Sequence, residues 1–325
     1  MKLARRLFLQ SAAVAASLPA LFRVARAQTY PSRPVRILVG FTAGSGPDIV
    51  ARLIGQWLSE RLGQQVLIEN RPGGASNIAT EAAVSAAPDG YTLLLATSGN
   101  AVNASLYEKL SFNFIRDIAP VAVITRTPHV MEVHPSFPAK TVPEFTAYAK
   151  ANPGKVTLAS AGNSSPGHLA GELLRMMVGI DLTHVPYRGA SQAVIDLVGG
   201  QVQVAIVTLA SSIEQIRAGK LRPIAMTTET RLDLLPDLPT VSEFVPGFEA
   251  SGWLGVGAPS DTPRDVIGRL NREINAGLAD SGLRAKFADL GLTPIAGSPA
   301  DFGKFIDVET DKWAKVVNFA GIKPE

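Results

Sequence analysis

The chain lacks cysteine altogether, and only 18% of its 325 residues are charged. Without cysteine it has no disulfide, no thiol nucleophile and no residue for lipid attachment at a mature N-terminus. Metal ligands are also scarce. The four histidines, at positions 129, 134, 168 and 184, show no metal-ligand spacing, and a zinc site without cysteine would need carboxylates that no pattern identifies. We therefore expect no metal.

Nucleotide-binding motifs are missing as well. No Gly-x-x-x-x-Gly-Lys-Ser/Thr phosphate loop occurs, and Gly44-Ser45-Gly46 lacks the third glycine of a dinucleotide fingerprint because Ile49 stands there. We therefore expect no cofactor.

Basic charge is confined to the N-terminus. The formal net charge is +3, but residues 1–27 hold five Lys and Arg and no Asp or Glu. The remaining chain has 26 Lys and Arg against 28 Asp and Glu. It also lacks any later run of the roughly 18 apolar residues that a membrane-spanning helix needs. Nothing in this balance favours a binder of phosphate backbones, so we expect no nucleic-acid partner.

Residues 1–27 have the composition of a bacterial secretory signal peptide. Arg5-Arg6 precedes an apolar stretch over 7–22, and Ala25-Arg26-Ala27 forms a cleavage signature. The order Arg5-Arg6-Leu7-Phe8-Leu9-Gln10 resembles the twin-arginine pattern, and a general secretory signal is equally compatible with it. We expect cleavage after Ala27 and a periplasmic product.

A long internal repeat is the main feature of the remaining chain. Residues 35–97 and 156–208 both read as strand, small-residue loop, helix, strand, small-residue loop, helix, strand. Apolar residues at 49, 50, 53, 54, 57 and 58 return 120 positions later on one predicted helical face. Gly74-Ala75-Ser76 and Gly189-Ala190-Ser191 each precede a predicted helix, and the closing strands end at Thr97 and Thr208. The repeat predicts two similar α/β lobes.

The chain is predicted to cross between the lobes twice. Residues 120–133 form a Val/Ile-rich strand interrupted at Pro128, and 251–258 form another apolar strand. Helices predicted over 263–279, 281–290 and 299–319 have no counterpart in the second unit, so we expect them to return to the first lobe. The predicted domains are residues 28–126 with 250–325, and residues 127–249.

The loops after the predicted strands are small and polar, and they lead into helix N-termini. Such positions offer free N–H groups and partial positive charge to an anion without a fixed side-chain charge, which favours a carboxylate. Asp48 would repel an anion there, so we interpret it as a first-turn residue paired with Arg52. Arg71, Arg126 and Arg188 could meet a second carboxylate.

An exported hydrolase is one alternative, with Ser164 as nucleophile and His168 as base four residues later. No Gly-x-Ser-x-Gly elbow supports it. His168 is more simply a polar residue near a helix start, at the repeat position of Asp48. We therefore expect no enzymatic activity.

At this point the motifs resemble those of the tripartite tricarboxylate transporter substrate-binding proteins, the Bug receptors. The resemblance covers essentially the whole mature chain. The motifs are Phe41-Thr42-Ala43-Gly44-Ser45-Gly46-Pro47-Asp48, Glu69-Asn70-Arg71-Pro72-Gly73-Gly74-Ala75-Ser76-Asn77, Pro88-Asp89-Gly90-Tyr91-Thr92, Ser160-Ala161-Gly162, His168-Leu169-Ala170-Gly171-Glu172 and Val185-Pro186-Tyr187-Arg188-Gly189.

The resemblance implies a type II periplasmic-binding-protein fold, a Venus flytrap of two α/β lobes joined by a two-strand hinge. It implies that the first two loops grip a ligand carboxylate through backbone N–H groups, that the second lobe sets specificity, and that membrane subunits of the transporter are partners. A signalling receptor for a carboxylate is the alternative within this architecture. We expect a monomer. The candidate ligand-binding residues are Phe41, Thr42, Ala43, Gly44, Ser45, Gly46, Ala75, Ser76, Asn77, Thr97, Ser98, Ser160, Ala161, Gly162, Asn163, His168, Arg188 and Thr208.

Overall fold

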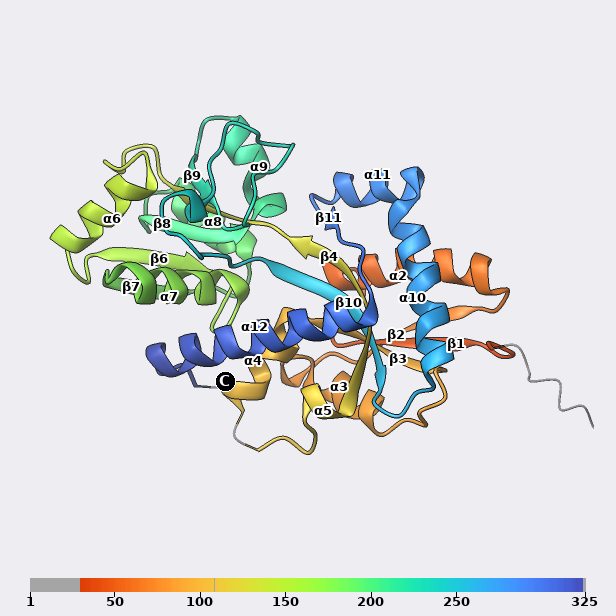
Figure 1. Cartoon of the computed structure of the whole chain (residues 1–325). Coiled ribbons are helices and arrows are strands. Elements are labelled where there is room, and N and C mark those ends of the chain that lie inside the picture. The colour runs from red at the N-terminus through yellow and green to blue at the C-terminus, as the bar shows by residue number, and fades with distance from the viewer. Residues whose placement is uncertain (1–29, 108, 324–325) are drawn as a thin grey trace, which may run out of the picture.

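The computed structural model describes residues 30–107 and 109–323, which form two mixed sheets flanked by helices (Figure 1). The predicted signal peptide lies outside the described residues. We call the six-stranded sheet with its covering helices the first lobe and the five-stranded sheet with its helices the second lobe. None of the helices in the described ranges has both the length and the apolarity required for a membrane span.

The first lobe has the strand order β11-β4-β10-β3-β1-β2. Strands β1, β2 and β3 are parallel, whereas β10 is antiparallel to both β3 and β4. The bounds are β1 Val35–Val39, β2 Val66–Asn70, β3 Thr92–Thr97, β4 Ile118–Thr127, β10 Gly252–Pro259 and β11 Thr293–Pro294.

The second lobe has the order β7-β6-β8-β5-β9, in which β6 is parallel to β7 and β8, and β5 is antiparallel to β8 and β9. Its strands are β5 His129–Val133, β6 Val156–Ser160, β7 Leu182–Pro186, β8 Val204–Thr208 and β9 Arg222–Met226. The predicted strand over 120–133 is thus two strands, β4 in one sheet and β5 in the other. Pro128 separates them because proline cannot donate a ladder hydrogen bond.

Apolar stripes predicted from the repeat form the cores. Val50, Ile54 and Leu58 are buried in the first lobe, and Leu169 and Leu173 are buried in the second. The helices are α2 Gly46–Leu62, α3 Asn77–Val84, α4 Ser98–Leu106, α5 Phe114–Asp117, α6 Val142–Ala151, α7 Pro166–Val178, α8 Ala190–Val198, α9 Leu209–Arg217, α10 Arg264–Ala279, α11 Ser281–Asp289 and α12 Pro299–Ala320, with 3-10 turns η1 Gly74–Ser76 and η2 Val241–Glu243.

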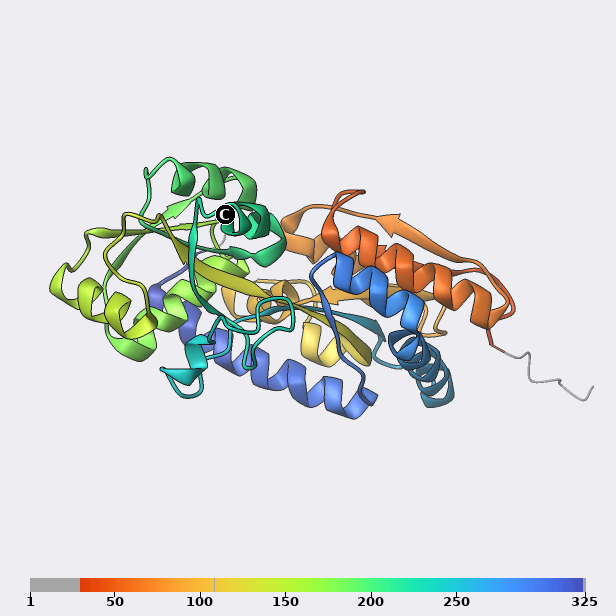
Figure 2. The same cartoon turned by 90° about the horizontal axis from the view of Figure 1, so that it is seen from above.

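The prediction that all three C-terminal helices return to the first lobe is incomplete for α12, which packs on the first lobe and also reaches the second. Helices α10 and α11 do pack in the first lobe, but α12 runs along both lobes (Figures 1 and 2). Its Phe302 and Ile306 belong to a first-lobe core, whereas Trp313 and Val317 lie in a cluster that joins Val102 and Leu106 of α4 to the second-lobe core. A helix of 22 residues spans roughly 33 Å. Helix α12 is therefore a third connection beside the two strand crossings.

The chain passes from one sheet to the other near residues 126 and 250, as predicted. The domain boundaries themselves stay a prediction.

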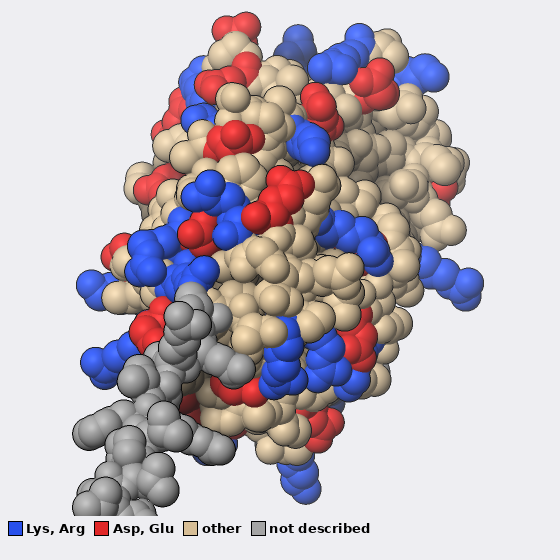
Figure 3. Space-filling view, turned by 90° about the vertical axis from the view of Figure 1, so that its right-hand side faces the viewer, with Lys and Arg blue, Asp and Glu red and all other residues tan. Residues whose placement is uncertain are grey.

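On the face shown in Figure 3, basic and acidic side chains are intermixed, without a continuous patch of one sign.

Candidate functional site

The candidate site is built on the turns that follow β1, β2 and β3 in the first lobe and β6, β7 and β8 in the second. Parallel strands bring their carboxyl ends to one edge of each sheet. Thr97 at the end of β3 pairs with Leu254, which also pairs with Thr125 of β4. Where β4 continues into the second lobe as β5, His129 pairs with Thr208, the last residue of β8. The ends of β3 and β8 therefore adjoin the same connecting segment.

The two lobes approach one another at Gly252, where no side chain intervenes. A Cβ atom built there would lie 3.8 Å from Ser98 Oγ of the first lobe and 3.7 Å from His129 Cε1 of the second. Burial lowers the pKa of His129 to about 4, against the opposing effect of its hydrogen bond to the Thr127 carbonyl. Its imidazole is therefore neutral near pH 7. The sequence motifs did not mark His129, although its place directly after Pro128 puts it at the start of a strand.

The β1–α2 turn is held by a buried carboxylate. Gly44 has a left-handed φ of 81°, and its N–H donates to Asp48 Oδ2 at 2.8 Å. Arg52 Nε donates to the same oxygen at 2.9 Å, and Asn70 Nδ2 donates to Asp48 Oδ1 at 2.8 Å and to the Phe41 carbonyl at 3.0 Å. The predicted pair of Asp48 with Arg52 is thus confirmed, and the carboxylate also shapes the turn.

The charge of Asp48 is compensated within this turn. Burial by itself would raise the pKa of the carboxyl, but the hydrogen bonds from Arg52, Gly44 and Asn70 outweigh it and lower the pKa to about 2. With its side chain only 2% exposed, Asp48 does not present a free negative charge to an anion at the turn.

The β2–α3 turn is strained. Ala75 has φ 51° and Ser76 has φ 75°, left-handed values that cost residues other than glycine on the order of 1–3 kcal/mol each. The turn packs tightly on the neighbouring loop, because a Cβ atom at Gly40 would lie 1.9 Å from Ser76 Oγ. Position 40 must therefore remain glycine for the two turns to meet. Strain that the surroundings maintain is typical of functional sites.

Two asparagines of α4 hold this strained turn. Asn103 Nδ2 donates to the Ala75 carbonyl at 2.8 Å. Asn100 Nδ2 donates to Thr80 Oγ1 at 2.8 Å, and Thr80 Oγ1 donates to the Ser76 carbonyl at 3.0 Å. Sequence reasoning missed both asparagines. The available signal was two asparagines three residues apart inside a short helix, where asparagine is a poor helix former.

Several of the backbone N–H groups expected to bind a ligand are already bonded within the protein. The amides of Ser45, Ser76 and Asn77 already donate to carbonyls within their own turns, at Thr42, Gly73 and Gly74. The hydroxyls of Ser45 and Ser76 are instead buried, and neither finds a hydrogen-bond partner in the part of the chain that the structure describes. A buried hydroxyl without a partner costs roughly 1–3 kcal/mol, which a ligand or ordered water recovers. The first-lobe candidates thus form one cluster with two unused hydroxyls.

The β6–α7 turn repeats the β1–α2 turn at the predicted offset of 120 residues. Ser164 has φ 58°, as Gly44 is left-handed, and its N–H donates to His168 Nδ1 at 3.0 Å, as Gly44 donates to Asp48. The N–H of Ser165 bonds to Gly162 as that of Ser45 bonds to Thr42. The sequence repeat is therefore a repeat of turn geometry.

The predicted second-lobe residues form a second cluster. Ser160 is fully buried and its Oγ donates to the Gly162 carbonyl at 3.0 Å. The Tyr187 N–H, one residue before Arg188, donates to the Ser160 carbonyl at 3.0 Å. Ala161 and Asn163 lie in the same turn, and Thr208 ends the neighbouring strand β8.

His168 lies in the first turn of α7, at the repeat position of Asp48, and its place among the ligand-binding candidates stays a prediction. It is buried, its ring stacks on His184 with centroids 3.7 Å apart, and its Nε2 lies 3.6 Å from Glu172 Oε1. Since Nδ1 accepts from the Ser164 N–H, it cannot also take a proton from the Ser164 hydroxyl. This geometry argues against the hydrolase alternative, and no cluster of metal-ligating residues was found within the described residues.

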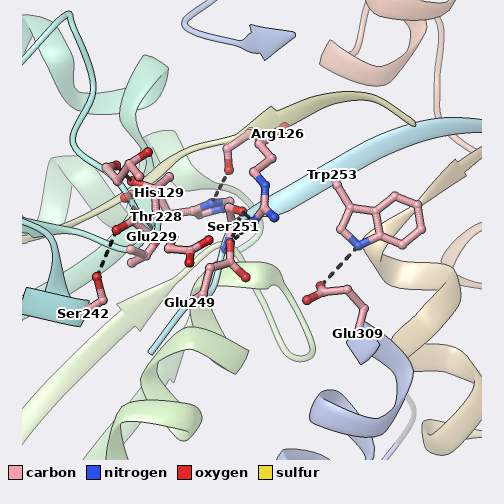
Figure 4. Close-up of polar contacts among 12 residues, drawn as sticks. Arg126, His129, Thr228, Glu229, Ser242, Glu249, Ser251, Trp253 and Glu309 are labelled. Atoms are coloured by element: carbon pink, nitrogen blue, oxygen red, sulfur yellow. Dashed lines mark hydrogen bonds and ion pairs between the residues drawn. The ribbon is translucent and has the colours of Figure 1, made fainter. Parts of the chain in front are cut away.

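Of the three candidate arginines, two are occupied. Arg71 pairs with Glu69, and Arg126 pairs with Glu249, so the suggestion that Arg126 is available to a ligand is wrong (Figure 4). Arg188 is exposed in the β7–α8 loop, and within the described residues no carboxylate pairs with it.

The Arg126–Glu249 pair belongs to a charged cluster at the lobe connections. Lys312 Nζ of α12 lies 2.9 Å from Glu249 Oε2 and also contacts Glu309. Trp253 Nε1 donates to Glu309 Oε2 at 3.2 Å (Figure 4). Burial would raise the pKa of Glu249, but the charges of Lys312 and Arg126 hold it below its usual value. The cluster ties β4, β10 and α12 together.

Known proteins resemble this chain over most of its length. The sequence profile of the tripartite tricarboxylate transporter family receptor matches residues 50–322. Protein BugT of Bordetella pertussis is 36% identical over 300 residues, 91% of this chain and 92% of BugT. The UPF0065 protein in the tcbD-tcbE intergenic region of Pseudomonas sp. (strain P51) is 36% identical over 297 residues, 91% of this chain and 88% of that protein.

Solved structures confirm the predicted fold class. R. palustris Rpa4515 with adipate superposes with a TM-score of 0.76 at 36% identity, covering 91% of this chain and all of that one. MatC from Rhodopseudomonas palustris with bound malate gives a TM-score of 0.72 at 31% identity, covering 89% of this chain and all of that one.

Proposed function

The chain belongs to the family of tripartite tricarboxylate transporter receptors, and on that premise we propose that it binds a small carboxylate between its lobes and delivers it to a membrane transporter of that class. In this proposal the protein is an exported, periplasmic, monomeric receptor without enzymatic activity, released from residues 1–27 by signal peptidase.

The observation that carries the proposal is the pair of buried hydroxyls, Ser45 before α2 and Ser76 before α3, which have no partner among the described residues. The two turns meet where Gly40 packs on Ser76. Helix N-termini favour negative charge, and hydroxyls donate to carboxylate oxygens. Because Asp48 is compensated by Arg52, no local carboxylate opposes the ligand. A neutral donor set of this kind suits a carboxylate better than a multiply charged phosphate.

The solved relatives support a ligand with two acid groups. The printed ligands of Rpa4515 and MatC, adipate and malate, are both dicarboxylates. In this chain Arg188 is the candidate arginine whose charge is not already matched by a neighbouring carboxylate in the described structure. We assign the first carboxylate to the first-lobe turns and the second to Arg188. Because both lobes then contact one ligand, binding favours the closed arrangement.

A thermal-shift screen of the mature protein tests the ligand class. Adipate and malate are expected to raise the melting temperature, with a stabilisation that grows as the logarithm of ligand concentration over Kd, whereas amines and sugars are not. A shift with amines or sugars and none with any carboxylic acid contradicts the proposal.

Ser76→Ala tests the site itself. Removing the unpartnered hydroxyl is expected to weaken adipate or malate binding about tenfold while leaving the free protein as stable or slightly more stable. Calorimetric titration and urea unfolding measure the two quantities. Unchanged affinity for every acid that the wild type binds would show that the hydroxyl does not contact the ligand. The matched control is Ser136→Ala, which removes a hydroxyl on the exposed surface of the second lobe.

A further inference from the structure

Both ring nitrogens of His168 face a polar group next to the second-lobe turn. Nδ1 accepts from the Ser164 N–H at 3.0 Å, and Nε2 faces Glu172 Oε1 at 3.6 Å. An imidazole that accepts at Nδ1 carries its proton on Nε2, which here points toward a carboxylate. The ring is therefore held as the neutral tautomer that the turn requires.

The Ser164 bond matters because of the backbone it restrains. Ser164 is left-handed without being glycine, so this conformation needs support from its surroundings. The rest of the turn is tied to it, since Ser165 Oγ donates to the Gly162 carbonyl at 2.7 Å and Ser160 Oγ donates to the same carbonyl at 3.0 Å. Loss of the acceptor at position 168 would leave Ser164 strained and its N–H unpaired.

We propose that neutral His168 is a positioning residue that holds the second-lobe turn, residues 161–165, in its ligand-binding shape, and that protonation of its ring loosens the turn and releases the ligand. The inference rests on the proposed function. Protonated Nδ1 becomes a donor and faces the Ser164 N–H, another donor, so the bond is lost. The ligand would then dissociate from the receptor more readily in acid.

The groups around His168 set the electrostatics of this step. Glu172, from the same helix, faces Nε2 and is itself bonded to Arg175 at 2.7 Å, and Arg175 also reaches Asp181. From β7, His184 stacks on the ring, and its Nε2 is bonded to Ser160 Oγ at 2.7 Å. Burial and the neighbouring His168 lower the pKa of His184 to about 4, so His184 stays neutral in mild acid.

The first lobe supplies an internal contrast. Asp48 performs the same task for Gly44, but its carboxylate remains an acceptor down to a pKa of about 2. Mild acid therefore leaves the first turn intact. A loss of ligand affinity in mild acid would come from the second lobe.

The test uses three variants of the mature protein. His168→Leu removes the acceptor, and His168→Asn offers a carbonyl oxygen near the position of Nδ1 that cannot be protonated in mild acid. Ser164→Gly in the His168→Leu background should restore part of the lost affinity, because glycine adopts φ above zero without strain. His134→Gln is the control, since His134 lies outside both turns and bonds Ser136.

Binding of adipate and malate is measured by calorimetry at about pH 7.5 and about pH 5.5, on either side of the usual histidine range. We expect wild type and His134→Gln to lose about tenfold in affinity at the lower pH, and His168→Asn to lose little. His168→Leu should be weak at both. Retention of the pH effect in His168→Asn, or tight binding by His168→Leu, overturns the inference.

A readout without ligand separates this inference from the proposed function. Amide hydrogen exchange over residues 161–165 is expected to speed up in acid, relative to the intrinsic rate, in wild type but not in His168→Asn. It should be fast at both pH values in His168→Leu. If no carboxylate binds the wild type, the proposed function fails, while unchanged exchange in His168→Leu overturns the role of His168 by itself.

Discussion

The two lobes build the same turn before a helix and hold it with different chemistry. In the first lobe the Asp48 carboxylate accepts from the Gly44 N–H, and in the second His168 Nδ1 accepts from the Ser164 N–H. The residue in the left-handed position differs too, glycine in one and serine in the other. The first turn therefore keeps its acceptor in mild acid, because the pKa of Asp48 is lowered to about 2. The second turn depends on an imidazole nitrogen as its acceptor.

The two lobes also differ in the pKa of a buried carboxyl group. Asp48 has three donors, and its pKa falls to about 2. Glu132 in β5 is fully buried, and neither carboxylate oxygen has a hydrogen-bond partner within the described residues. Burial raises its pKa to about 8, and the nearby Ser212 hydroxyl opposes the rise but lies outside hydrogen-bond geometry. The number of donors, and not burial alone, decides which form of a buried carboxyl is stable.

The largest effect is expected from Asp48→Ala. It leaves the Gly44 N–H without its acceptor and removes one of the two acceptors of the Asn70 amide, and we expect a loss of about 3 kcal/mol in the free energy of unfolding. Asp48→Asn keeps an acceptor and should lose about 1 kcal/mol. Because the folded pKa lies below the unfolded value, the charge-dependent part of this stability is present above about pH 4 and disappears as the pH falls toward 2. Urea unfolding against pH measures it. Equal losses for both variants would contradict the role of the acceptor.

Glu132→Gln is expected to act in the opposite direction. The folded pKa of about 8 lies above the unfolded value, so the wild-type group contributes stability below about pH 4 that is lost as the pH rises toward 8. The amide removes this cost, and we expect a gain of about 2 kcal/mol near pH 8 and almost none near pH 4. Thermal and urea unfolding at both pH values provide the check. A loss of stability near pH 8 would mean that Glu132 is paired in solution.

The smallest expected effect is on ligand affinity, and it tests whether each lobe binds a different carboxylate of the ligand. Arg188→Gln should weaken adipate or malate about tenfold, roughly 1.4 kcal/mol, and leave a monocarboxylate of similar length unchanged. Arg217→Gln, on α9 of the same lobe and already paired with Glu214, is the matched control. If the variant lost affinity for the monocarboxylate equally, Arg188 would bind the common acid group, and the division between lobes would be wrong.

Local patterns predicted the elements well. The strand predicted over 251–258 is β10, and the helices predicted over 263–279, 281–290 and 299–319 are α10, α11 and α12, each to within one residue at each end. Apolar periodicity is a property of neighbouring residues, so the sequence displays it directly. The supports of the β2–α3 turn were missed because Asn100 and Asn103 reach it across the sheet edge from another helix.

The repeat shows where sequence information ends. Gly74-Ala75-Ser76 and Gly189-Ala190-Ser191 are the same tripeptide, yet Ala75 and Ser76 are left-handed while Ala190 begins helix α8. Asn103 and Thr80 bond the carbonyls of the first tripeptide only. Identical local sequence thus takes two conformations because the surrounding hydrogen bonds differ.

By itself the sequence determined two α/β lobes, their strands and helices, and the polar turns that face outward from the sheets. The tertiary structure alone decided that α12 joins both cores and that Arg126 pairs with Glu249. It also decided that the hydroxyls of Ser45 and Ser76 have no hydrogen-bond partner within the described residues. The physical reason is the range of the interactions. Helix and strand formation depends on residues a few positions apart, whereas pairing and burial depend on which distant groups the fold brings within about 3 Å.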